Sequence, residues 1–355
     1  MDKNNIDGLV SEYIKNNLSP KPEEIKLITS RYEEISGILK GDNFQHGSYA
    51  RFTASTPDTD LDIVWVLPDD IIENIYPSYK SIKKIIDPDI LDLTNVIHDL
   101  SKKLQTEYEK LNRTVRIKPQ SHSVGIYFGE TDDEFSIDVV PAIPSGEKND
   151  YGEDIYLVPE IIKLSKINRS ERYTSKNPIS WIKSDPKGYI KDAQELNDNN
   201  EFFRKTAKFV KSWKRSCKEK NELFPLKSFH LELIVNKLFN ETGSLGCVDG
   251  ICSFFAALPD YAGKPQITDK ADSSRFIDSY LNDLTSEEKE VADRYMDIAK
   301  KAIEKIKHEP DLSTLGELLD GLIKEITETK QSNPANTTRV VDAFSRPYYA
   351  DNGNR

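Results

Sequence analysis

The spacing of hydrophobic residues changes along the chain and divides it into an α/β region followed by a helical region. Between residues 9 and 40 apolar residues recur at helical spacing, and the pattern breaks near Ser19-Pro20-Lys21-Pro22. Because proline interrupts helical hydrogen bonding, this segment predicts two helices with a break between them. Gly41 is expected to end the second helix.

Four runs rich in β-branched and aromatic residues then predict strands. They cover residues 61–67, 114–118, 123–128 and 134–140. A helix is predicted over 89–111, and Gly129-Glu130-Thr131-Asp132-Asp133 is typical of a hairpin loop between the last two strands. The segment from 144 to about 190 is rich in proline, lysine and asparagine and is expected to be an irregular connection.

From about residue 198 onward the pattern becomes helical. An apolar stripe at spacings of three and four is formed by Phe203, Ala207, Val210, Trp213 and Cys217. Further helices are predicted at 229–240, 272–282, 286–307 and 312–329. The final 25 residues carry Asn-Pro, Arg-Pro and Asp-Asn-Gly sequences and are expected to be a loosely held tail. The expected fold class is therefore α+β, with an α/β lobe followed by a helical lobe.

Composition narrows the class of protein. The 355 residues exceed what one domain usually needs, and no apolar run approaches the roughly 20 residues of a membrane span. Met1–Gly8 lacks the apolar core of a signal peptide. Cys217, Cys247 and Cys252 form no CxxC pair, so buried structural thiols are favoured over metal ligands. Together these features predict a cytoplasmic protein without a membrane segment.

The net charge of −11 disfavours one class of ligand. Proteins that bind a duplex neutralise its phosphates with basic side chains, so this acidic chain is not expected to require a long nucleic acid. Nucleoside triphosphates remain compatible with the charge, because Mg²⁺ arrives with them and supplies the missing positive charge.

Three aspartates are the strongest candidates for chemistry. Asp60 and Asp62 enter the first predicted strand, and residues at i and i+2 of a strand point to the same face. Asp138 lies in a later strand, on the face opposite its apolar neighbours. Close carboxylates resist ionisation unless cations neutralise them. If the two strands pair side by side, the three acids can hold two Mg²⁺ ions, for which Mn²⁺ can substitute, in the arrangement that clamps the attacking and leaving oxygens of an in-line displacement.

A Gly-Ser pair accompanies these acids, and Ser48 lies twelve residues before Asp60. Gly47 lets the backbone approach a phosphate closely, and the Ser48 hydroxyl is a hydrogen-bond donor. Either feature alone is common in ordinary turns and solvated loops. Their ordered combination with a third acid on a separate strand predicts a phosphate-binding and metal-binding site.

At these residues the chain resembles the DNA polymerase β-like nucleotidyltransferase superfamily. Its signature is a hydrophobic residue followed by Gly and then by either Gly or Ser, a short spacer, Asp-x-Asp and a later acid. The matching residues are Phe44–Thr53, Asp60-Leu61-Asp62 and Asp138. More narrowly, the chain resembles the bacterial cGAS/DncV-like nucleotidyltransferases (CD-NTases), relatives of oligoadenylate synthetases. Val210–Lys214 and Lys227–Glu232 are similar to the Lys-x-Trp and x-aromatic-x-Leu-Glu helices of those synthetases. The resemblance covers roughly residues 40–240.

The hydrophobic pattern and the resemblance together predict an organisation of the whole chain. Residues 1–40 are expected to form N-terminal helices that pack on both lobes, and residues 41–165 a polymerase-β-like catalytic lobe with a mixed sheet and flanking helices. Residues 166–330 are expected to form a helical lobe that completes the nucleotide pocket. Residues 331–355 are left as a flexible tail.

The resemblance also implies roles for individual residues. Asp60 and Asp62 would bind both metal ions, and Asp138 would bind the catalytic metal and help activate the attacking hydroxyl. Gly47 and Ser48 would hold the donor triphosphate.

Three residues of the helical lobe receive roles in the same way. Lys211 would reach the donor phosphates, Ser228 would touch the nucleotide, and Phe229 or a nearby aromatic residue would lie under the base. Lys211 has an alternative as part of a solvated helix face with Lys208 and Arg215, and Ser228 has an alternative as the N-cap of the helix at 229–240.

The implied activity is synthesis of a cyclic di- or trinucleotide, or a short oligonucleotide, from nucleoside triphosphates with release of pyrophosphate. ATP is expected among the substrates, a regulatory or effector protein among the partners, and bacterial anti-phage defence as the setting. Two alternatives stay open: a terminal nucleotidyltransferase acting on RNA or protein, and a non-catalytic scaffold of the same fold. The acidic composition disfavours handling of tRNA, and the presence of all three aspartates disfavours the scaffold.

Overall fold

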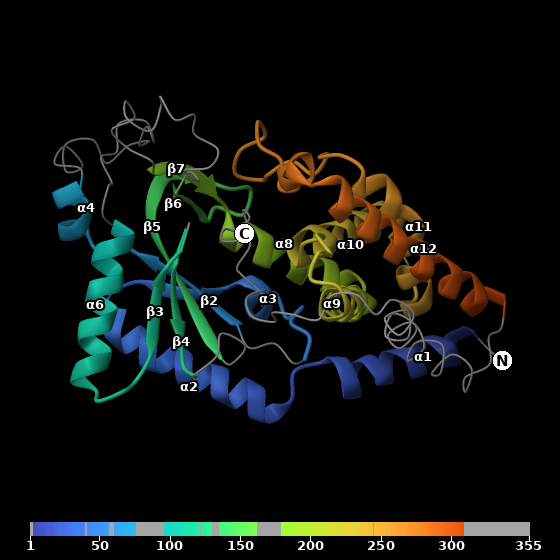
Figure 1. The fold of residues 1–355 in the computed structure, drawn as a ribbon, viewed down its shortest axis with the longest axis horizontal. Helices are drawn as coiled ribbons and strands as arrows, with labels where there is room; N and C mark the ends of the chain where they lie inside the picture. The colour runs from blue at the N-terminus through green and yellow to red at the C-terminus, as the bar shows by residue number, and fades with distance from the viewer. Residues whose placement is uncertain are drawn as a thin grey trace.

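The computed structural model describes residues 3–39, 41–56, 60–75, 96–120, 122–129, 135–161, 179–243 and 245–308. Within this part of the chain, a mixed sheet with flanking helices adjoins a helical lobe (Figure 1). The predicted α+β class is therefore confirmed. The predicted helix at 312–329, the tail at 331–355, the first residues of the helix at 89–111 and most of the hairpin loop at 129–133 lie outside the described residues.

The sheet contains seven strands in the described part of the chain. Its main path runs through β1 (Asn43–His46), β2 (Asp60–Val66), β5 (Ser136–Lys148), β4 (Val124–Tyr127) and β3 (Arg116–Pro119). Strands β2 and β5 are parallel, and the other pairs are antiparallel. The long strand β5 continues beyond this path, where its second half pairs with β6 (Asp154–Ile161), which in turn pairs with β7 (Ile179–Ser184).

One face of the sheet packs against α2 (Pro22–Leu39) and α6 (Val96–Lys110). The side chains of Leu61, Ile63, Ile137 and Val139 are fully buried in this core. Because side chains alternate along a strand, the aspartates between them face the other side of the sheet. The other side carries a smaller apolar cluster, formed by Val64, Val140, Ala142, Tyr156 and Val158.

The helical lobe is built from α8 (Pro186–Asn199), α9 (Phe202–Lys220), α10 (Ser228–Thr242), α11 (Cys247–Ala262) and α12 (Ser286–His308). Trp213 on α9 lies at its centre, with edge-to-face ring contacts at 5.5 Å to Phe224 and 5.0 Å to Phe255. All three cysteines are buried and unbridged, and burial raises the pKa of Cys247 to about 12. They are therefore structural thiols, as expected.

The N-terminal helices contribute to both cores. Side chains from α1 (Lys3–Tyr13) and the π-helical segment η1 (Ile14–Leu18) join the core of the helical lobe, whereas α2 joins the core of the sheet. The break between them falls at Ser19–Lys21, as the proline-rich segment predicted.

Two predictions about the middle and end of the chain were wrong. The segment 144–190 contains the end of β5, strands β6 and β7, and the start of α8 in place of an irregular connection. Asp185 caps α8 by accepting a hydrogen bond from the Gly188 amide at 2.8 Å, and Pro186 follows at the first turn, a start signal that lies in the sequence itself. No helix spans 272–282; this stretch contributes an isolated bridge between Thr268 and Phe276 and the 3₁₀ helix η3 (Ser279–Asp283).

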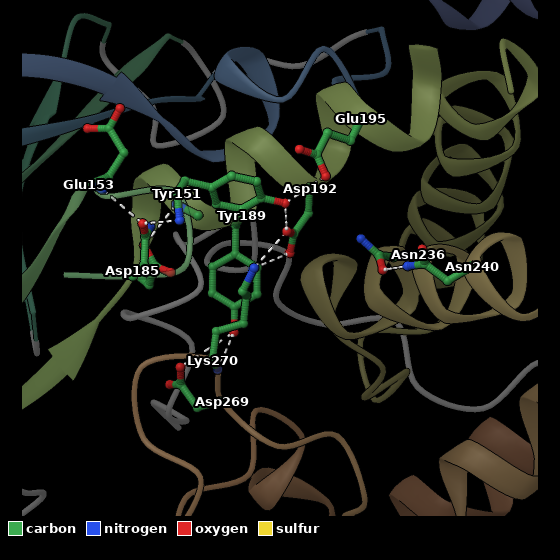
Figure 2. Close-up of polar contacts among 12 residues, drawn as sticks. Tyr151, Glu153, Asp185, Tyr189, Asp192, Glu195, Asn236, Asn240, Asp269 and Lys270 are labelled. Atoms are coloured by element: carbon green, nitrogen blue, oxygen red, sulfur yellow. Dashed lines mark hydrogen bonds and ion pairs between the residues drawn. The ribbon is translucent and has the colours of Figure 1, made fainter. Parts of the chain in front are cut away.

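A cluster of polar contacts joins the turn between β5 and β6 to the helical lobe (Figure 2). The Tyr151 hydroxyl lies 2.8 Å from Asp192 Oδ1 and 2.9 Å from Glu195 Oε2, both on α8. Lys270, in the loop after α11, forms an ion pair with Asp192 at 2.6 Å, and its backbone amide donates to the Tyr189 hydroxyl at 3.1 Å. These bonds fix the sheet against α8.

None of the described helices is by itself both long and apolar enough to cross a membrane. Helices α10 and α11 together reach that length and composition, but they meet at an angle of 115°.

Candidate active site at the junction of the two lobes

The three predicted aspartates lie on adjacent strands. In the parallel pair β2–β5, Asp62 is directly opposite Asp138, and Asp60 is opposite Ser136. Asp60 and Asp138 are 8% and 3% exposed, so these carboxylates have been removed from most of their water. The strand pairing that the sequence analysis required is therefore present, and the three acids share one face of the sheet.

Gly47 brings the backbone of the Gly-Ser turn against one of these acids. It adopts a φ of +67°, and a Cβ built on it would lie 1.7 Å from Asp62 Oδ2. Both observations require glycine at this position. Ser48 follows within the short helix α3 (Gly47–Ala50), and its carbonyl accepts hydrogen bonds from Thr53 N at 2.9 Å and Ala54 N at 3.2 Å. Figure 1 shows α3 between β2 and α9, where the two lobes meet.

Two neutral side chains donate hydrogen bonds to the outer acids. Ser136 Oγ donates to Asp60 Oδ1, and Gln120 Nε2 donates to Asp138 Oδ1 at 2.8 Å. A neutral donor stabilises a carboxylate without adding a positive charge beside it.

His46, opposite Asp62 on the antiparallel strand β1, does not add a positive charge. Burial, assisted by the charge of Arg51, lowers the pKa of His46 to about 3. At neutral pH the imidazole is uncharged, so the acids are not neutralised from this side.

The chemical type of these side chains suits a hard divalent cation. Carboxylate oxygens are ligands that Mg²⁺ and Mn²⁺ prefer, and the absence of a Gly47 side chain leaves the Asp62 carboxylate in contact with the backbone of the turn. In the described residues, no three His, Cys, Asp or Glu side chains are gathered in a ready-made coordination geometry.

A buried ionic cluster lies beside the acids and joins the lobes. Arg51, directly after α3, donates from Nε to Glu232 Oε1 on α10 at 2.6 Å. Thr53 Oγ1 donates to Glu232 Oε2 at 2.9 Å, and Lys211 on α9 forms an ion pair with the same carboxylate. Burial by itself raises the pKa of a carboxyl, but the charges and hydrogen bonds of Arg51 and Lys211 outweigh it and lower the pKa of Glu232 to about 2. Glu232 is therefore ionised throughout the physiological range.

The structure places Lys211 in this cluster and not on a solvated helix face. Its side chain is only 6% exposed, and Nζ lies 2.9 Å from Thr53 Oγ1. Its predicted neighbours on the same face also contact the chain itself: Lys208 reaches Ser19 Oγ at 3.2 Å, and Arg215 reaches the Thr56 carbonyl at 2.6 Å. The solvated-face alternative for Lys211 is therefore wrong.

The other two predicted residues of the helical lobe lie at the start of α10. Ser228 is the first residue of the helix and is preceded by Lys227 at the N-cap, so the N-cap alternative for Ser228 is wrong. Phe229 is 7% exposed and packs edge-to-face on Tyr189 at 5.0 Å, and the Arg51 guanidinium lies 4.7 Å from the centre of its ring. This ring contacts protein groups in the present structure.

Sequence reasoning gave no role to several residues that shape the site. Arg51, Thr53 and Glu232 lie within the recognised motifs, but the motifs predicted no role for them. Gln120 and Ser136 carried no predicted role either. A buried ion pair between residues separated by 181 positions leaves no local spacing signal. The Leu-Glu sequence in an apolar helix was the one available hint, because a carboxylate inside a core requires a cationic partner.

Comparison with known proteins identifies the fold. No protein-family model and no curated protein sequence matches the chain. Among solved structures, the chain is similar to CdnC of E. coli MS115-1 in complex with HORMA-deltaN, with a TM-score of 0.61 and 14% identity over 91% of this chain and 97% of that chain. The same CdnC with ATP gives a TM-score of 0.59 at 14% identity, covering 90% and 96% of the two chains.

A second similar structure is Vibrio cholerae DncV, a cyclic AMP-GMP synthase and prokaryotic cGAS homolog. Its TM-score is 0.51 at 12% identity, with 90% of this chain and 84% of that chain covered. At such low identity the similarity establishes architecture. The chain therefore has the fold of the bacterial cGAS/DncV-like nucleotidyltransferases, as its motifs predicted.

Proposed function

We propose that this protein is a metal-dependent nucleotidyltransferase that joins nucleoside triphosphates into a cyclic di- or trinucleotide, or a short oligonucleotide, and releases pyrophosphate. The observation that carries the proposal is the register of Asp62 opposite Asp138 on parallel strands, with Asp60 beside them and Gly47 against the Asp62 carboxylate. Placing three carboxylates close together costs free energy because their charges repel one another. Binding of divalent ions and of a triphosphate would offset this repulsion and would explain the arrangement.

Each part of the site has a task in this reaction. Asp60 and Asp62 would hold the metal ions that accompany the donor triphosphate, and Asp138 would hold the catalytic ion and orient the attacking hydroxyl. When bound, Mg²⁺ neutralises the charge that develops on the attacking and leaving oxygens. Gly47 and Ser48 would receive the triphosphate on the backbone of their turn.

The helical lobe would complete the nucleotide site. Lys211 is a buried cation beside the Gly-Ser turn, and it would exchange its present contacts with Glu232 and Thr53 for a phosphate. Ser228 and Phe229 are proposed to contact the nucleotide, with Phe229 near the base after movement of the Arg51 guanidinium that now lies over its ring.

The arrangement of basic side chains supports an activity that needs no long nucleic acid. One face of α9 would offer a basic strip, but its three cations contact the chain itself. Lys208 contacts Ser19, Lys211 contacts Glu232, and Arg215 contacts Thr56. With the net charge of −11, little positive surface remains on this face for a duplex.

We further propose a protein partner and a setting. CdnC, which shares this fold, is found in complex with HORMA-deltaN and also with ATP. By analogy, this chain would act in the cytoplasm in bacterial anti-phage defence, with ATP among its substrates and a regulatory or effector protein bound to it.

The test is a reaction of the purified chain with all four α-labelled ribonucleoside triphosphates and Mg²⁺, followed by phosphatase and mass spectrometry. A phosphatase-resistant product of two or three nucleotides, absent in EDTA and with Asp62→Ala, is the expected result. Transfer only to added RNA or protein would support a terminal transferase. Absence of any pyrophosphate release, with and without candidate partners, would support the non-catalytic scaffold.

A further inference from the structure

The third acid of the site is held by a side chain that has no assigned role. Gln120 follows β3, and its Nε2 donates to Asp138 Oδ1 at 2.8 Å and lies 3.1 Å from the Tyr127 hydroxyl. Asp138 itself is 3% exposed, so little water is available to replace this donor. The hydrogen bond fixes one oxygen of the carboxylate in a defined direction.

The orientation of the Gln120 amide is itself determined by its surroundings. Ser123 Oγ, which belongs to a fully buried residue, donates to Gln120 Oε1 at 3.1 Å, and Gln120 N donates to the Ser123 carbonyl at 2.9 Å. With the oxygen of the amide engaged by a hydroxyl donor, the NH₂ group is the end that faces the carboxylate. A flipped amide would place two oxygens against each other.

The space for this amide is provided by a glycine. Gly125 on β4 is the register partner of Asp138 on β5. A Cβ at Gly125 would lie 2.4 Å from Gln120 Nε2 and 2.9 Å from a ring carbon of Tyr127. Any side chain at position 125 would therefore displace the amide from the carboxylate.

We propose that Gln120 is a positioning residue for Asp138. Ser123 orients its amide by a hydrogen bond, and Gly125 leaves the space that the amide occupies. Gln120 fixes one oxygen of the third carboxylate as an uncharged donor, so this partner adds no positive charge beside the acid. A charged donor at this place would form an ion pair with Asp138 and compete with the metal for it. The inference rests on the proposed function, because it assigns to Asp138 the catalytic ion and the attacking hydroxyl.

Four variants test the proposal. Gln120→Leu removes the donor, Gln120→Glu keeps the size of the side chain and replaces the donor with a carboxylate, and Gly125→Ala displaces the amide without changing it. Gln105→Leu, at an exposed glutamine of α6 whose amide donates to Glu109 at 2.8 Å, is the matched control.

Turnover, triphosphate affinity, Mn²⁺ binding to the free protein and melting temperature are measured for each variant. The first three variants are expected to lose about 10- to 100-fold in kcat and in Mn²⁺ affinity, as for other partners of metal ligands. The melting temperatures of the two Gln120 variants, and the affinity of all three variants for a non-reacting triphosphate analogue with Mg²⁺, are expected to stay near those of Gln105→Leu. Gly125→Ala is expected to melt somewhat lower, because its new methyl group also meets the Tyr127 ring. This split separates positioning from a general loss of fold.

Three outcomes would overturn the proposal. Wild-type kcat and Mn²⁺ affinity in Gln120→Leu would show that the donor is idle, and full activity in Gln120→Glu would show that the side chain only fills space. A joint fall of melting temperature, triphosphate affinity and kcat would assign Gln120 a structural role. If the wild-type protein transfers no nucleotide, the proposed function fails, and Mn²⁺ affinity alone decides whether Gln120 positions Asp138.

Discussion

Arg51, from the turn that follows the Gly-Ser pair, donates to Glu232 of the helical lobe at 2.6 Å, and both side chains are almost fully buried. The two residues are 181 positions apart, so this ion pair is a direct connection between the segment after the Gly-Ser turn and α10. Lys211 contacts the same carboxylate from α9. Glu232 therefore links the segment that follows the Gly-Ser turn to Lys211 of α9 as well as to α10.

Removal of that acid is expected to destabilise the protein strongly. Glu232→Ala leaves Arg51 and Lys211 buried without their anion, and breaking such a buried pair costs about 3–5 kcal/mol of unfolding free energy. Glu232→Gln, which keeps the volume and can still accept hydrogen bonds, is expected to cost less. Urea unfolding measures both, with Glu241→Ala at an exposed position of α10 as the control. A loss below about 1 kcal/mol in Glu232→Ala would mean that the cluster contributes little.

Removal of each aspartate is expected to separate activity from stability. Asp60→Ala, Asp62→Ala and Asp138→Ala should abolish product formation, while the melting temperature of the metal-free protein holds or rises, because fewer carboxylates then repel one another. Asp293→Ala, at an exposed position of α12, is the control for both measurements. Wild-type turnover in Asp62→Ala would contradict the assignment of the site.

A pair of glycine variants tests the turn. Gly47→Ala places a methyl group 1.7 Å from Asp62 Oδ2 in a backbone with φ +67°, so both turnover and unfolding free energy should fall. Gly37→Ala lies at an exposed position of helix α2 with no atom within 4 Å of the new Cβ, and should stabilise the protein by about 0.5–1 kcal/mol. If both variants behave alike in denaturant unfolding and in turnover, the close approach of Gly47 to Asp62 has no consequence.

Ligand binding is expected to depend on the divalent ion even without turnover. A non-reacting triphosphate analogue at about 100 times its Kd should add about 2.7 kcal/mol to the unfolding free energy in the presence of Mg²⁺ or Mn²⁺. EDTA should remove this gain, because three carboxylates repel a triphosphate that has lost its ion. Thermal unfolding with Asp62→Ala as the control measures the effect. Equal stabilisation in EDTA would argue against a metal-dependent site.

Stability is expected to fall as soon as the pH drops below about 6.5. Burial lowers the pKa of His46 and His122 to about 3 and of His230 to about 4. Because these folded-state values lie below the unfolded value of about 6.5, the unfolded chain takes up the protons first. The contribution of each neutral histidine to the unfolding free energy is therefore fully present above pH 6.5. It is lost as the pH falls from 6.5 to the pKa of the folded state, by about 1.4 kcal/mol per pH unit for each histidine.

Urea unfolding at about pH 7.5 and at about pH 5.5 checks this slope. His230→Gln should reduce it by about one proton, whereas His98→Gln, at an exposed position of α6, serves as the control. The same slope in the wild type and in His230→Gln would show that this imidazole does not contribute.

The sequence by itself determined most local elements of the sheet-containing lobe and the identity of its candidate acids. Alternation of apolar and polar residues placed Asp60 and Asp62 on one face of a strand, and the same alternation separated Asp138 from Ile137 and Val139. The Gly-Ser turn and the break at Ser19–Lys21 were equally local, because glycine and proline act on their own backbone. Strands β6 and β7 escaped prediction, since prolines such as Pro159 interrupt their pattern.

Only the tertiary structure decided what surrounds those acids. The register that puts Asp62 opposite Asp138 depends on the pairing of strands 76 positions apart, which no spacing along the chain encodes. The burial of Lys211 beside Glu232 likewise requires α9 and α10 to pack against the Gly-Ser turn. Local propensity acts over a few residues, whereas the desolvation and pairing of charges depend on groups that meet only when the chain has folded.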